Sequence, residues 1–168
     1  MEYQLKSISK AGIPEAIAKV ELYRYLNEPE EAESICRDIL SIDPLHQLAR
    51  RFLGLAITDQ FTGASSDRFK EAEEIFQKLA ERYEQFYYTG LLCERRAKAQ
   101  LRAGHPPHTL VPLFDRALRC FADAEKMRPA GNDDSILRWN RCVRLLRSPG
   151  YDWESEIESF EAHDAPPR

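Results

Sequence analysis

Apolar residues near the start of the chain recur every three or four positions, which is the spacing of one face of an α-helix. Between residues 13 and 26 they are Ile13, Ala16, Ile17, Val20, Tyr23 and Leu26. A period of 3.6 residues places these side chains on one side of a helix, and Pro14 suits the first helical turn. The pattern therefore predicts an amphipathic helix.

The same period continues along most of the chain. It predicts six further helices, at about 29–41, 45–56, 69–83, 85–103, 110–127 and 132–147. No segment of useful length alternates between apolar and polar residues at period two, so no strand is predicted. We expect an all-α fold.

Three of these helices share a small residue followed four positions later by a larger apolar one. The pairs are Ala32 with Cys36, Ala72 with Phe76, and Ala117 with Phe121. Pro44 and Pro129 follow the first and third pairs, and Leu53, Gly54 and Tyr23 lie in the preceding helices. Together these residues resemble the tetratricopeptide repeat (TPR), a helical pair of about 34 residues whose small side chains admit close contact and whose aromatic rings fill the gaps.

The resemblance implies antiparallel helix pairs stacked as an α-solenoid. The expected parts are an N-terminal lead-in at 1–12, repeats at 13–46, 47–86 and 87–131, a capping helix at 132–147, and an acidic tail at 148–168. Glu84 stands where a proline is expected, and the loop at 61–66 lengthens the second repeat. The stretches YYTGLLCERRAKAQL and RPAGNDDSILRWN also resemble small uncharacterised bacterial TPR proteins.

The last predicted helix has an apolar side and a basic side. Ile136, Trp139, Cys142, Val143 and Leu146 are expected to pack, and Arg138, Arg141, Arg144 and Arg147 to face solvent. In the tail, Trp153, Ile157 and Phe160 follow at spacings of four and three. They predict a short docked helix, with disorder or self-association of copies through Trp153 and Phe160 as alternatives.

Composition fits one soluble domain. The chain has 168 residues, 43% of them hydrophobic, and a mean hydropathy of -0.55. Its apolar runs are shorter than the roughly 20 residues that cross a membrane, and its first ten residues do not match a secretory signal. Its four cysteines are scattered without metal-ligand spacing, which favours reduced core residues and a cytoplasmic location.

Charge is unevenly distributed along the chain. Residues 91–150 carry 12 basic and 6 acidic side chains, whereas 151–168 carry 1 and 6. Within the basic segment we expect Arg95 or Arg96 to form an ion-pair cluster with Asp133 or Asp134. The segment 95–147 also raises an alternative function, nucleic-acid binding with stacking on Tyr87, Tyr88 or Trp139, although the net charge of -4 counts against it.

Catalytic motifs are missing from the sequence. There is no glycine-rich phosphate loop and no nucleophile or metalloprotease motif, and His105 and His108 lie in a proline-rich turn without a third ligand. We therefore expect no enzyme, no metal and no cofactor.

Instead, the resemblance implies a protein-interaction scaffold that binds a peptide or protein surface in a concave groove lined by the first helix of each pair. The groove residues it implies are Ile17, Glu21, Arg24 and Tyr25, then Arg51, Leu55 and Asp59, then Glu94, Lys98 and Arg102. Glu21 and Leu55 stand where the family's carboxylate clamp has asparagine, so that clamp is not expected.

Overall fold

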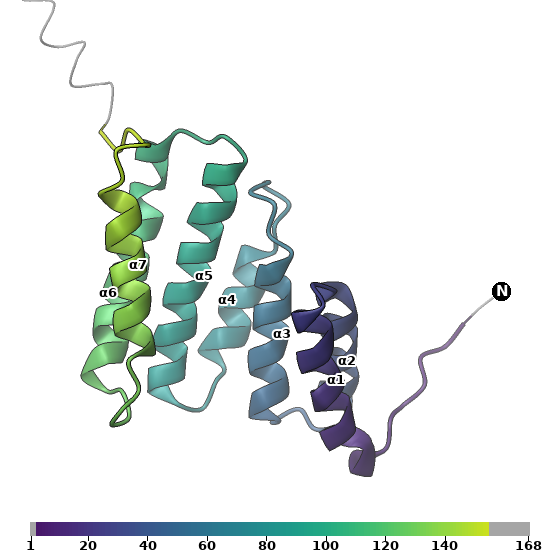
Figure 1. Cartoon of the computed structure of the whole chain (residues 1–168). Helices are drawn as coiled ribbons and strands as arrows, with labels where there is room; N and C mark the ends of the chain where they lie inside the picture. Colours follow the sequence, from purple (N-terminus) through teal and green to yellow (C-terminus); the bar gives the residue numbers. More distant parts are fainter. Residues whose placement is uncertain (1–2, 155–168) are drawn as a thin grey trace, which may run out of the picture.

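The helices follow one another across the molecule in chain order (Figure 1). The structure, a computed structural model, describes residues 3–154. Its α-helices are α1 (Ile13–Tyr25), α2 (Pro29–Ile42), α3 (Gln47–Asp59), α4 (Phe69–Gln77), α5 (Arg82–Arg102), α6 (Val111–Lys126) and α7 (Asp134–Leu146), and single 3-10 turns at Lys10–Gly12 and Pro107–Leu110 precede α1 and α6. No strand occurs between residues 3 and 154, so the predicted all-α class is confirmed.

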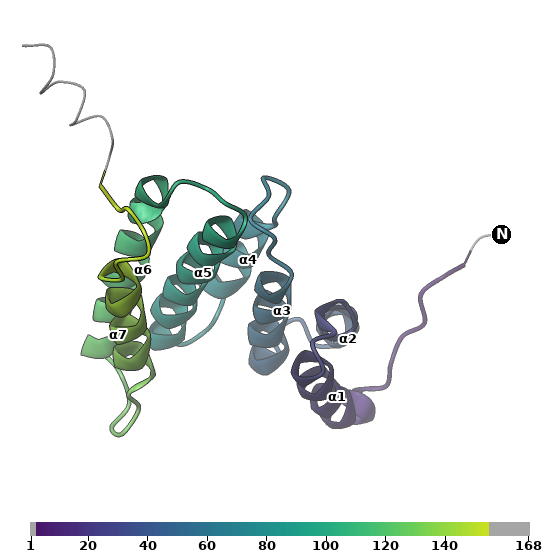
Figure 2. The ribbon, with the colours of Figure 1, turned by 45° about the horizontal axis from the view of Figure 1, so that its top comes forward.

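Each helix packs against the next one in the chain. The odd-numbered helices make additional contacts with one another, α1 with α3, α3 with α5, and α5 with α7. In Figures 1 and 2 these four helices lie side by side, and α2, α4 and α6 lie behind them. The fold therefore presents one continuous face made of α1, α3, α5 and α7.

The small and aromatic residues that carry the sequence pattern are buried. Ala72, Phe76 and Ala117 have no exposed surface, and Phe121 is 1% exposed. Buried apolar side chains form two clusters, one spanning α1 to α5 and the other joining α5 to α6 and α7. Because both clusters contain residues of α5, this helix ties the two halves of the core together.

Two glycines allow aromatic rings to approach the backbone of the odd-numbered helices. A Cβ atom built on Gly54 of α3 would lie 2.3 Å from the Phe76 ring of α4. A Cβ atom on Gly90 of α5 would lie 2.7 Å from the Phe121 ring of α6. Both distances are well below van der Waals contact, so the two interfaces require glycine for the same steric reason.

The boundary between α4 and α5 differs from the prediction. The apolar spacing continues to Tyr83, but α4 ends at Gln77 and α5 begins at Arg82, so the expected repeat boundary at residue 86 falls inside α5. Side chains hold the intervening turn: Gln47 Oε1 accepts from the Ala80 N–H at 2.8 Å, and Arg50 donates to the Lys78 carbonyl at 2.6 Å. These contacts from α3 replace hydrogen bonds that a continued helix would make.

The loop between α3 and α4 is fixed to α5. Asp67 accepts hydrogen bonds from the backbone N–H groups of Thr62 and Gly63, at 3.0 and 2.8 Å. Arg96 of α5 contacts the Asp67 carboxylate and donates to the Ala64 carbonyl at 2.7 Å. Since the side chains of Arg96 and Asp67 are 13% and 4% exposed, this ion pair is largely shielded from water.

We expect Arg96→Gln to loosen this loop and to lower the free energy of unfolding by about 1 to 2 kcal/mol, because Asp67 loses its buried cationic partner but keeps its backbone donors. Hydrogen exchange should accelerate at Thr62 and Gly63 before it changes in α1. The matched control is Lys70→Gln, since Lys70 is exposed. Unchanged exchange in the loop of the Arg96 variant would contradict the assignment.

The segment after α7 turns back onto the core. The Trp153 ring lies edge-on to Phe114 of α6, with 5.5 Å between ring centroids. Trp153, the first of the three predicted tail positions, thus packs against the core of its own chain. The other two positions, Ile157 and Phe160, lie outside the described residues.

Candidate functional site

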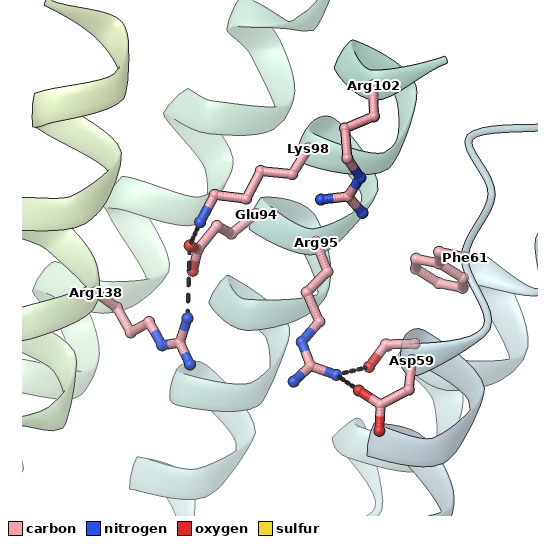
Figure 3. A pocket seen from close by; sticks show the side chains of 8 residues that line it. Asp59, Phe61, Glu94, Arg95, Lys98, Arg102 and Arg138 are labelled. Atoms are coloured by element: carbon pink, nitrogen blue, oxygen red, sulfur yellow. Dashed lines mark hydrogen bonds and ion pairs between the residues drawn. The ribbon is translucent and has the colours of Figure 1, made fainter. Parts of the chain in front are cut away.

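A pocket of about 270 Å³ opens where α3, α5 and α7 approach one another (Figure 3). Its lining side chains are Thr58 and Asp59 at the end of α3, Phe61 just after it, Glu94, Arg95, Lys98 and Arg102 on α5, and Arg138 on α7. All the helical contributors belong to odd-numbered helices, so the pocket lies on the face that these helices share.

Asp59 forms the centre of the first charge cluster in the pocket. Its carboxylate accepts a hydrogen bond from Arg24 Nε at 2.8 Å and contacts Arg95 from the other side. Arg95 also donates to Thr58 Oγ1 at 2.6 Å, which places a cation at the C-terminal end of α3, where the helix dipole favours one. Burial lowers the pKa of Arg95, and Asp59 opposes that change.

Glu94 forms the centre of the second cluster and is completely buried. One of its carboxylate oxygens contacts Lys98 on the same helix and lies 3.6 Å from Arg138 Nη1 on α7. The other oxygen, Oε2, is buried without a hydrogen-bond partner. Burial has the largest single influence on the pKa of Arg138 and acts to lower it, but Glu94 and a hydrogen bond with Tyr87 together raise this pKa.

Arg102 is exposed at the edge of the pocket, and its side chain makes no hydrogen bond or ion pair with any residue between 3 and 154. The four cationic side chains of the lining outnumber its two carboxylates, and each carboxylate already contacts two cations. The pocket therefore carries surplus positive charge, with Phe61 as its apolar wall.

Half of the predicted groove residues meet in this pocket. Asp59, Glu94, Lys98 and Arg102 line it. Arg24 joins them through Asp59. The other predicted residues lie elsewhere: Glu21 and Tyr25 are exposed on α1, Ile17 and Leu55 belong to the core, and Arg51 is paired with Glu84 and lies over the Tyr88 ring.

The predicted ion-pair cluster of Arg95 or Arg96 with Asp133 or Asp134 is wrong. Arg95 pairs with Asp59 and Arg96 with Asp67, while Asp133 pairs with Arg128. Asp134 lies near Tyr83, in the first turn of α5. Tyr83 and Arg95 are twelve positions apart on α5, which is about 18 Å along the axis. Arg95 therefore reaches the end of α3 and Arg96 the loop after it.

The prediction that Arg138 faces solvent holds only in part, because its side chain is 39% exposed and the remainder is covered. Ser135 and Cys142 are the buried residues of α7, and Arg138 lies between them at helical spacings of three and four. Trp139, expected to pack, is 37% exposed. The side of α7 that faces the core carries Ser135, Arg138 and Cys142. The prediction missed this side because it followed the larger apolar residues of the helix.

The aromatic residues proposed for base stacking are largely engaged inside the protein. Tyr88 stacks on Phe76 with ring centroids 5.3 Å apart, and burial raises its pKa to about 12. Tyr87 stacks on Tyr83 at 5.8 Å. Several basic residues of the same segment are paired with carboxylates, including Arg116 with Glu73. These contacts count against reading the basic segment as a nucleic-acid surface.

The cysteines have the character of core residues. Cys36, Cys93 and Cys142 are buried, and burial raises the pKa of each thiol to about 12, which keeps it protonated. Cys120 is half-buried. Within residues 3–154, no group of three or more histidine, cysteine or acidic side chains is placed to hold a metal ion.

Over the same residues, no helix has the length and apolar character that crossing a membrane requires. Comparisons with models of known protein families, with curated proteins and with solved structures gave no match for this chain.

Proposed function

We propose that the chain is a TPR-like α-solenoid of antiparallel helix pairs. Two observations support this architecture. The odd-numbered helices contact one another in sequence along one face, and the close approach of a phenylalanine to a glycine occurs both between α3 and α4 and between α5 and α6. Stacked repeats are expected to use the same packing contact in successive pairs, as these two glycine–phenylalanine contacts do.

The function proposed for this solenoid is a noncatalytic scaffold that binds a peptide or protein surface along the face of odd-numbered helices. The observation that carries the proposal is the pocket itself, because helices that are distant in sequence bring fixed charges together there. The absence of a disulfide among the four cysteines is compatible with the cytoplasmic location expected for it.

The proposal predicts that Arg102→Glu abolishes capture of a protein partner from an extract of the cell that makes this protein. Arg102 is exposed beside the pocket and has no ion-pair partner among residues 3–154, so reversing its charge should alter the binding face with little effect on folding. The measurement is affinity purification followed by mass spectrometry, with circular dichroism as the check on folding.

Lys70→Glu is the matched control, because it makes the same charge change at an exposed position of α4, away from the pocket. A partner held by the wild type and by the Lys70 variant, but lost with Arg102→Glu, supports the proposal. Equal loss with both variants, or no partner at all, argues against it.

A further inference from the structure

The charges of the pocket indicate what kind of segment the proposed scaffold takes. Asp59 is shared by Arg24 and Arg95, and Glu94 by Lys98 and Arg138. Each carboxylate can balance only one of its two cations, and Arg102 adds a further positive charge. An incoming group with negative charge therefore gains attraction from several fixed cations.

Those cations are spread around the pocket. In Figure 3 the guanidinium groups of Arg95, Arg102 and Arg138 lie at separate places, with Glu94 beside Arg138 and Asp59 beside Arg95. A single compact anion such as phosphate is bound best by donors that converge on one point. Cations distributed along α5 and across to α7 match carboxylates that are spaced along an extended chain.

Glu94 is the buried negative charge of the pocket lining. Its Oε2 atom is buried and accepts no hydrogen bond, which is an energetically unfavourable state for a carboxylate oxygen. Its neighbours Lys98 and Arg138 both contact the other oxygen. Because Oε2 has essentially no exposed surface, an incoming donor does not reach it, and Glu94 acts on a bound group only through its charge, which Lys98 and Arg138 largely offset.

We propose that this pocket recognises an acidic peptide segment, with a side-chain carboxylate of the partner bound by Arg102 and Arg138. The inference rests on the proposed scaffold function and specifies its partner. Phe61 contributes the apolar wall against which the methylene groups of an acidic side chain pack.

The test is fluorescence anisotropy of a fluorescein-labelled deca-glutamate peptide titrated with the full chain, with deca-glutamine as the uncharged probe. We expect saturable binding of deca-glutamate only, weakening as salt rises from about 50 to 200 mM. Arg102→Gln and Arg138→Gln should each weaken binding by about five- to tenfold.

Arg144→Gln is the matched control because Arg144 is an exposed residue of α7 outside the pocket, and it should change affinity by less than about twofold. Glu94→Gln should strengthen binding about threefold or more, since it removes a competing carboxylate from the pocket. Should that variant misfold, the two arginine variants still decide the matter.

Three results would overturn the inference: no saturation by about 1 mM protein, an equal effect of Arg144→Gln and Arg102→Gln, or displacement of the peptide by submillimolar inorganic phosphate. The scaffold proposal fails separately, when the purification described above retains no partner that depends on Arg102. If such a partner is captured but deca-glutamate does not bind, the acidic-peptide inference is refuted and the scaffold proposal is not.

Discussion

Phe76→Ala is expected to lower the free energy of unfolding by about 3 to 5 kcal/mol, the cost of emptying a fully buried aromatic site. Phe76 lies against Gly54 of α3 and stacks on Tyr88 of α5, so its loss removes contacts on both sides of α4. Urea denaturation followed by circular dichroism measures the change.

A double-mutant cycle with Gly54 makes this prediction specific. In the wild type, Gly54→Ala should destabilise by about 1 to 3 kcal/mol, because the added methyl group collides with the Phe76 ring and this outweighs the gain in helix propensity of about 1 kcal/mol. In the Phe76→Ala background the ring is gone, so the same substitution should stabilise. Two destabilisations that simply add would show that the residues are not in contact.

Glu33→Gln is expected to cost about 2 to 3 kcal/mol at pH 7. The Glu33 carboxylate accepts two hydrogen bonds from Arg68, both at 2.6 Å, one from Gln60 at 2.7 Å, and further ones from Arg37. These residues join α2 to the end of α3 and the start of α4. The hydrogen bonds from Arg68, opposed by burial and reinforced by those from Gln60 and Arg37, lower the Glu33 pKa to about 2.

The sign of the pH dependence follows from this lowered pKa. A carboxylate with a folded-state pKa of about 2, below its ordinary value of 4.5, contributes its full stability above pH 4.5 and loses it as the pH falls towards 2. The difference in unfolding free energy between wild type and Glu33→Gln should therefore shrink across that window.

Denaturation curves collected from pH 7 down to pH 3 measure this difference. Glu15→Gln is the control, because Glu15 is 77% exposed and its one ion pair among residues 3–154 is with Lys19 on its own helix. Its effect should stay below about 0.5 kcal/mol at every pH. A difference for Glu33→Gln that stays constant as the pH falls would refute the role assigned to the carboxylate.

The helices and the buried small residues were predictable because both depend on local spacing. Ala72 and Ala117 occupy core positions that follow from the 3.6-residue period, whichever helices lie opposite them. The end of α4 was not predictable in the same way, because side chains of α3 stop that helix although its apolar spacing continues.

The candidate site was predictable only in part. The repeat resemblance implied that the odd-numbered helices share a face. That was sufficient to predict that four residues lie together: Asp59, Glu94, Lys98 and Arg102. Assigning partners to Arg95 and Arg96 required knowing which end of α5 lies near the loop after α3. Several carboxylates could have paired with these arginines, and the sequence does not show which of them lies nearest in space.

By itself the sequence determined the all-helical class and the residues that pack between helices, because hydrophobic periodicity and residue size act over a few neighbouring positions. The tertiary structure alone decided which charges meet. Ion pairs such as Arg95 with Asp59 and Arg138 with Glu94 join helices separated by long stretches of chain, and Coulomb attraction depends on distance in space, which local patterns do not encode.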